Sequence, residues 1–288
     1  MATLRAIRKR ISSVKGTEQI TKAMKMVSAA KLRRAQAAIE NARPYAKKIH
    51  DVVSDLAQGV EPSIHPLLRT REPKRIGVLV ITSDRGLCGG FNTNLNKKAE
   101  NFIKENKERY EEIILYTVGK KVYRFLSKQG YNVDPSFTEI LGSLSYQDAK
   151  NITKVVIEGY IGNSLDAFFM IYHEFKSALV QRIVVEDLLP IRPEEKTIAE
   201  GESDYIFEPG KRELLSELLP KYIETEIWRA LLESSASEHG ARMTAMENAT
   251  KNANEMIDNL TLKMNRARQE SITKELLDIV GGAEALKD

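Results

Sequence analysis

Long segments without helix breakers occupy both ends of this chain. Residues 1–43 contain one glycine, Gly16, and no proline, and residues 221–280 contain one glycine, Gly240, and no proline. Because Pro and Gly are the residues that most disfavour helix interiors, both segments are predicted to be helices, roughly 65 Å and 90 Å long at about 1.5 Å per residue. Globular helices average about a dozen residues, so these lengths indicate elements that pair with one another.

Apolar residues recur along each terminal segment at alternating steps of three and four. The first segment has Leu4, Ile7, Ile11, Val14 and, after a phase shift, Ile20, Met24 and Val27. The last segment has Ala253, Ile257, Leu260, Met264 and Ala267. This spacing averages 3.5 residues, as in a left-handed coiled coil. One helix enters the middle of the chain and the other leaves it, so a side-by-side pair is predicted to be antiparallel.

Proline and glycine mark the expected ends of these helices. Pro44 is expected to kink or end the first helix, and the proline-containing segment 61–66 to interrupt the chain. Gly281 and Gly282 are expected to close the last helix. The resulting division is a coiled-coil helix over 1–60, an α/β domain over 74–208 and a coiled-coil helix over 211–288.

The middle of the chain alternates short apolar runs with helical patterns. Runs rich in branched residues predict buried strands, and the segments between them have helical periodicity. The predicted strands are 75–82, 113–118, 167–175 and 182–188, and the predicted helices are 92–107, 120–128 and 146–160. Such alternation indicates a Rossmann-like βαβ domain with a mainly parallel sheet, in which the last two strands form an antiparallel edge. The fold class is therefore α/β with a long antiparallel coiled coil.

Composition argues against a membrane span, a disulfide and a metal or catalytic site. Charged residues make up 29% of the chain, the mean hydropathy is −0.35, and no run of about eighteen apolar residues is present, so a soluble protein without a membrane span is expected. A single cysteine, Cys88, excludes an internal disulfide and is expected to be a buried small residue rather than a nucleophile. The four histidines have no metal-ligand spacing. No catalytic constellation emerges, and neither a cofactor nor a metal is expected.

The turn Gly86–Gly90 lies between a predicted strand and a predicted helix, where a phosphate-binding loop would be found. It lacks the Gly-Lys-Ser/Thr ending of a Walker loop and the spaced glycines of a dinucleotide fingerprint. A tight structural turn is the favoured interpretation, and nucleotide binding is the alternative.

The first helix is strongly basic. Residues 1–48 contain thirteen Lys or Arg and only two acidic residues, Glu18 and Glu40. Such a segment fits nucleic acid, an anionic membrane surface, an acidic protein partner or simply a solvated helix face. Aromatic residues that stack on bases are absent from positions 1–44, which argues against single-stranded nucleic acid.

The end of the last helix is apolar around most of its circumference, through Ile272, Leu276, Leu277, Ile279 and Val280. A helix that is apolar on all sides is usually buried. A coiled-coil end has nothing of its own to bury it, so insertion into a hydrophobic sleeve on a partner is predicted. The alternatives are an end folded back on the body and a self-association interface.

Three motifs resemble one known family. They are 20–27 (ITKAMKMV), 83–92 (SDRGLCGGFN) and 267–276 (ARQESITKEL), in the order and positions of the gamma subunits of F-type ATP synthases. The resemblance covers the whole chain. It implies a non-catalytic central rotor stalk that couples proton-driven c-ring rotation to conformational changes in the catalytic beta subunits.

The resemblance also implies partners and contact residues. The expected partners are the ring of three alpha and three beta subunits, the epsilon subunit and the c-ring, with no nucleic acid and with membrane contact only through the c-ring. Nine residues are implied to contact partners: Met24, Lys25, Arg242, Arg268, Gln269, Thr273 and Glu275 toward beta, and Tyr205 and Glu208 toward the c-ring. The N-terminal residues have neither a secretion signal nor a transit peptide, so the expected location is the cytoplasmic side of a bacterial cell membrane, as a peripheral protein.

Overall fold

The computed structural model describes residues 4–57, 60–192 and 210–284. These residues form two compact units. The helix-pair unit consists of the described parts of Met1–Ser28 and Met243–Asp288, and the sheet unit is Ala29–Arg242. The elements in chain order are α1 (Leu4–Ala57), η1 (Pro62–Ile64), η2 (Pro66–Leu68), β1 (Arg75–Ile81), α2 (Phe91–Asn106), β2 (Glu112–Val118), α3 (Lys120–Lys128), β3 (Val133–Phe137), α4 (Tyr146–Ile161), β4 (Ala167–Phe175), β5 (Gln181–Leu189) and α5 (Lys211–Glu284).

The sheet unit is built on five strands in the order β3-β2-β1-β4-β5. The pairs β1–β2, β1–β4 and β2–β3 are parallel, and β4–β5 is antiparallel. The predicted mainly parallel sheet with an antiparallel edge is therefore confirmed. The strands β1, β2 and β4 are each followed or preceded by a helix, which is the connection that parallel neighbours require.

Two apolar clusters cover the two faces of this sheet. Along β1, Ile76, Val78 and Val80 join the cluster with α2 and α3, whereas Leu79 and Ile81 join the cluster with α1, α4 and α5. This alternation follows from the two-residue period of a strand. Because both faces are covered, β1 is apolar along almost its whole length, as expected for a central parallel strand.

The strand β3 is the one strand that the sequence pattern did not predict. It contains Asp134 and Pro135, which are both depleted in strands. Proline cannot donate to a ladder, but β3 lies at the edge of the sheet, where one side of the strand needs no partner. The tertiary position of the segment therefore overrides its local propensity.

Each long helix continues past a proline or glycine at which the sequence predicted a kink or an end. The helix α1 includes Pro44, and α5 includes Pro220 and extends beyond Gly281 and Gly282 to Glu284. The prediction that Gly281–Gly282 closes α5 is therefore wrong. Pro44 is exposed, so the carbonyl that loses its intrahelical donor lies on the solvent side, while Ile39 and Ile49 on either side are buried. Packing on both sides offsets the lost hydrogen bond.

Candidate partner-binding surface

The helix-pair unit contains the antiparallel pairing that the seams predicted. Thr21 Oγ1 lies 2.8 Å from Thr250 Oγ1, and Lys25 Nζ lies 2.7 Å from Glu247 Oε1. The residue number rises along α1 as it falls along α5, so the two helices run in opposite directions. The predicted residues of the α5 seam, from Ala253 to Ala267, are buried or half-buried.

The seam of α1 differs from the prediction between residues 18 and 28. Thr21 and Ser28 are 8% and 3% exposed, whereas the predicted seam residues Ile20 and Val27 are 61% and 57% exposed. The actual seam keeps alternating steps of three and four through small polar residues, which satisfy their hydroxyls within the helix pair. Ser28 donates to the carbonyl of Met24. Ile20, Val27 and Met26, which is also exposed, are therefore available to a partner.

The hydrogen bond between Thr21 and Thr250 predicts a specific pattern of stability. Thr21→Val is expected to reduce the free energy of local unfolding of the helix-pair unit by about 1 kcal/mol, because the hydroxyl of Thr250 loses a partner. Thr21→Val with Thr250→Val is expected to recover most of this loss, since two apolar groups of the same shape then face each other. Native-state hydrogen exchange at 17–25 and 246–254 measures both. A double variant that is less stable than the single variant would contradict the prediction.

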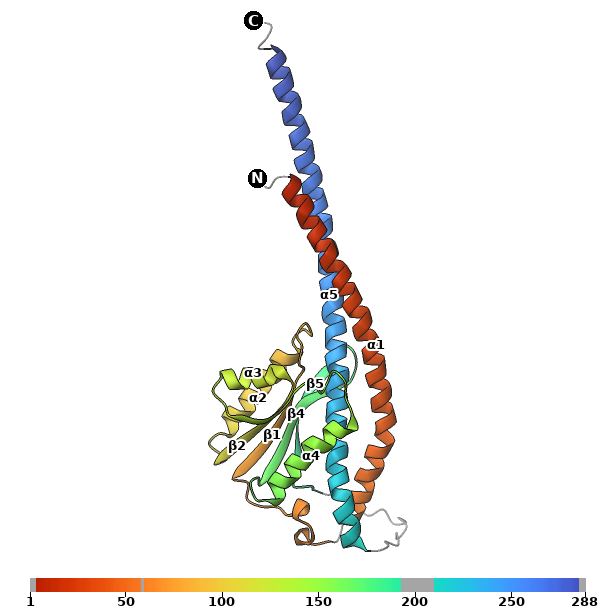
Figure 1. Cartoon of the computed structure of the whole chain (residues 1–288), viewed down its shortest axis with the longest axis vertical. Helices are drawn as coiled ribbons and strands as arrows, with labels where there is room; N and C mark the ends of the chain where they lie inside the picture. Colours follow the sequence, from red (N-terminus) through yellow and green to blue (C-terminus); the bar gives the residue numbers. More distant parts are fainter. Residues whose placement is uncertain (1–3, 58–59, 193–209, 285–288) are drawn as a thin grey trace. The chain divides into compact units, whose positions relative to one another are not determined.

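The end of α5 extends beyond its partner helix. If the register of Thr21–Thr250 continues at equal rise, Leu4 lies level with about Ala267, and the following turns have no α1 residue beside them. Figure 1 shows α5 continuing past the N-terminal end of α1. The apolar residues of this segment are all exposed, namely Ile272, Leu276, Leu277, Ile279 and Val280, at 48–68%. Within the described residues they are not folded back onto the chain.

The residues implied to contact partners fall into separate groups. Met24 and Lys25 are half-buried on α1, with the Lys25 side chain 39% exposed and paired with Glu247. Four residues lie exposed near the end of α5: Arg268, Gln269, Thr273 and Glu275. Because Lys25 is level with Glu247, about 30 Å of helix separates the two groups at 1.5 Å per residue. Tyr205 and Glu208 lie outside the described residues.

Arg242 lies in the sheet unit and has partners within the chain. Its guanidinium is 2.7 Å from Glu238 Oε1 and donates to the carbonyl of Gly86 at 3.2 Å. The side chain is only 11% exposed. Burial raises the pKa of Glu238 although Arg242 opposes the shift. Burial, with Arg242 and Lys31 nearby, lowers the pKa of His239 to about 4, so this histidine is neutral at pH 7.

The turn at 83–90 has the geometry of a structural turn. Asn92 accepts from the backbone and hydroxyl of Ser83 and donates back to that hydroxyl. Asp84 accepts from the backbone amides of Lys120 and Glu139, which ties the turn to two neighbouring connections. Cys88 is 2% exposed, and burial raises the pKa of its thiol, so it is poorly suited to act as a nucleophile.

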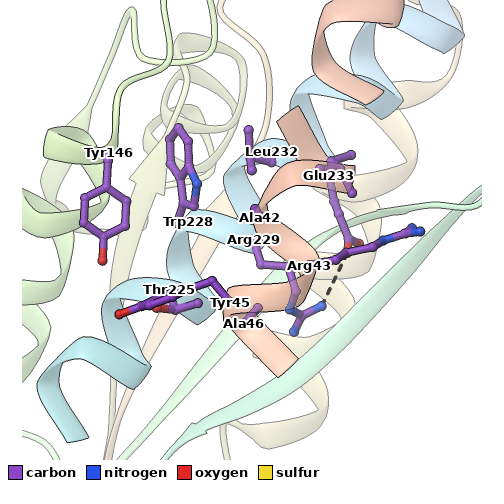
Figure 2. Close-up of a pocket in the computed structure, with 11 residues that line it drawn as sticks. Ala42, Arg43, Tyr45, Ala46, Tyr146, Thr225, Trp228, Arg229, Leu232 and Glu233 are labelled. Atoms are coloured by element: carbon purple, nitrogen blue, oxygen red, sulfur yellow. Dashed lines mark ion pairs between the residues drawn. The ribbon is translucent and has the colours of Figure 1, made fainter. Parts of the chain in front are cut away.

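A cavity of about 350 Å³ lies in the sheet unit between α1, α4 and α5 (Figure 2). Its walls are mainly apolar and aromatic, and they include Tyr45 from α1, Tyr146 from α4 and Trp228 from α5. Tyr146 is the first residue of α4, and among the described lining residues there is no glycine-rich loop that could hold a phosphate. Among the described residues, no group of His, Cys, Asp and Glu has the arrangement of a metal site.

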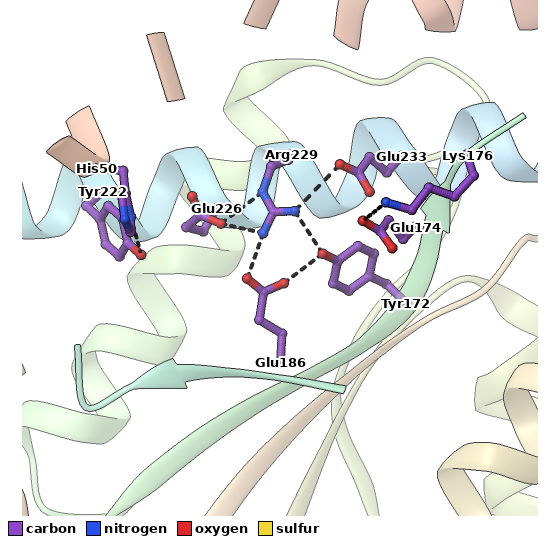
Figure 3. A network of polar contacts seen from close by, with 9 residues as sticks. All are labelled: His50, Tyr172, Glu174, Lys176, Glu186, Tyr222, Glu226, Arg229 and Glu233. Atoms are coloured by element: carbon purple, nitrogen blue, oxygen red, sulfur yellow. Dashed lines mark hydrogen bonds and ion pairs between the residues drawn. The ribbon is translucent and has the colours of Figure 1, made fainter. Parts of the chain in front are cut away.

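Next to this cavity, a charged network joins α5 to the sheet (Figure 3). Arg229 on α5 donates to Glu226 at 2.6 Å, to Glu186 on β5 at 2.7 Å and to the hydroxyl of Tyr172 on β4 at 2.9 Å. Tyr172 donates in turn to Glu186 at 2.6 Å. Glu233 lies 3.5 Å from Arg229, and burial raises the pKa of its carboxyl. One guanidinium thus contacts three carboxyl groups and connects α5 to two strands.

Comparison with known proteins identifies the family. The family described as ATP synthase matches residues 3–286. The ATP synthase gamma chains of Trichlorobacter lovleyi and Geobacter metallireducens are each 52% identical to this chain, over 288 and 287 residues, with 100% of both chains covered. The chain belongs to the ATP synthase gamma-chain family. It is a non-catalytic subunit that serves as the central rotor stalk, which confirms the interpretation of the three motifs.

Solved structures agree with this assignment. The central stalk and c-ring structure of Tetrahymena thermophila mitochondrial ATP synthase contains a chain with a TM-score of 0.61 and 27% identity, covering 80% of this chain and 99% of that one. A chain in the Euglena gracilis mitochondrial ATP synthase has a TM-score of 0.70 at 23% identity and covers 98% of this chain and 94% of that one, which shows the shared fold. The predicted α/β class with two long helices is thereby confirmed.

Proposed function

We propose that this gamma-family chain acts through two surfaces of its helix-pair unit on a surrounding ring of three alpha and three beta subunits. The first surface is the basic and apolar face of α1 around Met24 and Lys25. The second is the end of α5 from Arg268 to Val280. The observation that carries this proposal is the exposed apolar end of α5, because five large apolar side chains on one short segment indicate a binding site rather than a solvated helix.

The proposed coupling rests on differential contact. Chemically identical subunits hold different nucleotide affinities only when something binds their conformations unequally, and the energetic effect equals that difference in binding. The two helices of the pair present different side chains to their surroundings. On α1 the exposed residues include Ile20, Met26 and Val27, and on α5 they include Arg268 and Gln269. Rotation would present each beta subunit with these faces in turn and so couple ion flow to ATP synthesis or hydrolysis.

The charge of α1 supports a partner with acidic segments. Arg5, Arg8, Lys9, Arg10, Lys15 and Lys22 are all exposed. Lys25 differs from them because Glu247 already neutralises it at 2.7 Å. An acidic beta residue that approaches Lys25 would therefore share it with Glu247. The six exposed basic residues, which form no ion pair within the described part of the chain, supply the stronger attraction for that partner.

The remaining contacts are proposed from the family assignment. The segments 1–60, 74–208 and 211–288 are assigned as first shaft helix, basal α/β domain and second shaft helix. Tyr205 and Glu208 are assigned to the c-ring, and the α/β domain is assigned to both the c-ring and the epsilon subunit. No helix in the described residues is long and apolar enough to cross a membrane. From the family assignment we propose a peripheral position on the cytoplasmic side of a bacterial cell membrane, reached through the c-ring.

Co-purification tests the proposed partners. The chain, expressed with the alpha and beta subunits of its own genome, is expected to elute as one complex with one copy of this chain per six partner subunits. Native mass spectrometry measures that ratio. A chain that elutes alone while the partners form their ring, or a complex with another ratio, would overturn the proposed arrangement.

A further inference from the structure

We propose that the cavity between α1, α4 and α5 is a binding site for a small amphipathic anion, with an aromatic or similarly flat apolar body and a single carboxylate or sulfonate. All residues that line it belong to the sheet unit. Its volume of about 350 Å³ is within the range of small-molecule sites, roughly 300–1,000 Å³. The site is separate from both surfaces through which the chain is proposed to act on its ring.

One end of the cavity suits a flat apolar body. Tyr146 and Trp228 meet edge to face, with ring centroids 5.8 Å apart and planes at 82°, and Tyr45 lies 55% exposed beside them. Ala42 and Ala46 leave room opposite these rings, because an alanine adds only a methyl group to the wall. Aromatic walls of this kind favour a planar ligand that stacks or meets a ring edge.

The hydroxyls of Tyr146 and Thr225 at this end already have partners. Tyr146 donates to Glu224 at 3.0 Å, and Thr225 donates to the carbonyl of Lys221 at 2.7 Å. Burial and the hydrogen bond to Glu224 raise the pKa of Tyr146 to about 12, so its hydroxyl keeps its proton at neutral pH. A ligand body that needs hydrogen bonds would find few free groups here, which favours an apolar one.

The other end supplies one uncommitted cation. Figure 2 shows Arg43 at the end with Arg229 and Glu233, away from Tyr146 and Trp228. The guanidinium of Arg229 is engaged by Glu226, Glu186 and Tyr172, and Glu233 faces Arg229. Within the described residues Arg43 makes no ion pair, and it is exposed at the cavity. A guanidinium is suited to a planar carboxylate or a sulfonate, which sets the charge of the proposed ligand.

The single tryptophan of the chain reports on this site directly. Trp228 is the only tryptophan, and it lines the cavity. The full-length chain is titrated with 8-anilinonaphthalene-1-sulfonate, an aromatic monoanion. Saturable binding is expected, with quenching of Trp228 and energy transfer to the dye. Bound ligand should also raise the midpoint of thermal unfolding of the sheet unit, because it stabilises the folded state. Dye fluorescence without energy transfer from Trp228 would overturn the proposal.

Two variants separate the site from other apolar surfaces. Ala42→Leu fills the cavity and is expected to weaken binding by about tenfold or more. Leu276→Gln with Leu277→Gln removes apolar surface from the end of α5 and is expected to leave energy transfer unchanged. Equal binding by the Ala42→Leu chain, or loss of the signal in the α5 variant, would place the dye elsewhere and overturn the proposal.

The contact with the charged head group is tested without changing the apolar walls of the cavity. Arg43→Gln is expected to weaken binding of the sulfonate about fivefold while leaving uncharged N-phenyl-1-naphthylamine unaffected. Arg33→Gln, an exposed position on the same helix, is the matched control and should change neither. Equal loss for both dyes, or no loss for the sulfonate, would overturn the anionic assignment. If the Ala42→Leu chain does not fold, the comparison of Arg43→Gln with Arg33→Gln still tests the proposal.

Discussion

Arg229→Met is expected to destabilise the sheet unit by about 3 kcal/mol. The substitution leaves Glu226, Glu186 and Glu233 close together without their shared cation, and removing one partner of a buried ion pair costs about 3–5 kcal/mol. The lower end applies because the side chains of Arg229 and Glu186 are 27% and 35% exposed, so water screens part of the effect. Urea unfolding followed by Trp228 fluorescence measures the difference, since Trp228 is the neighbouring residue.

The loss of stability caused by Arg229→Met should depend on pH in a defined direction. Burial already raises the pKa of Glu233 from its usual value of 4.5, and loss of Arg229 removes the group that opposes this shift. A carboxyl whose pKa is raised in the folded state binds a proton more tightly there than in the unfolded chain, so its stabilising effect is present at low pH and lost as pH rises. The stability deficit of Arg229→Met is therefore expected to be smaller at pH 5 than at pH 7.5.

A matched control is available in the same unit. Arg124 on α3 is exposed, and Arg124→Met is expected to change the free energy of unfolding by less than about 0.5 kcal/mol at either pH. A loss below about 1 kcal/mol for Arg229→Met, or a deficit that grows as pH falls, would show that the network is not an anchor for α5.

Removing residues 272–288 is expected to reduce the ATP-driven turnover of the assembled complex severalfold while leaving the sheet unit intact. The described residues of this segment have no α1 residue beside them, and its five large apolar side chains are exposed. Burying each of them in a partner would contribute roughly 1.5 kcal/mol or more. The shortened chain should keep the urea transition reported by Trp228, because that residue lies in the other unit.

A second variant distinguishes the effect of apolar contact from the effect of helix length. Replacing Ile272, Leu276, Leu277, Ile279 and Val280 by Gln keeps the length and helix propensity of the segment. This chain is expected to reduce turnover nearly as much as the deletion does, because burial of the apolar side chains in the partner, rather than the length of the helix, is proposed to matter. Turnover near the unaltered level in both chains would argue against insertion of this end. A lost Trp228 transition would show that the end packs against its own chain.

The outline of the fold is encoded in local pattern. Breaker-free ends and steps of three and four predicted two long helices, and alternating strand and helix patterns predicted the parallel sheet with its antiparallel edge. These features depend on residues close in sequence, whose period follows from backbone geometry. In two places where a local rule failed, tertiary position explains the failure: β3 forms around Pro135 because it lies at a sheet edge, and α1 continues through Pro44 because its neighbours are packed.

On the surface of the helix pair, local pattern also fails to predict the burial of single residues. Hydrophobicity placed Ile20 and Val27 in the seam, but the register with α5 buries Thr21 and Ser28 and exposes the two apolar residues. Arg242 and Arg229 are two charged residues on one helix, and no local signal marked either of them as nearly enclosed or as the centre of a network. Their partners lie as much as 156 positions away in the chain.

The sequence by itself determined the five α-helices, four of the five strands, the antiparallel sense of the two terminal helices and the gamma-chain family, because periodicity and motifs are read from neighbouring residues. Only the tertiary structure decided which face of α1 is free for a partner, how Arg229 fastens α5 to β4 and β5, and that Trp228, Tyr146 and Tyr45 enclose a cavity. Each of these depends on a register between segments far apart in the chain, and register is set by the packing of whole faces rather than by the residues of either segment alone.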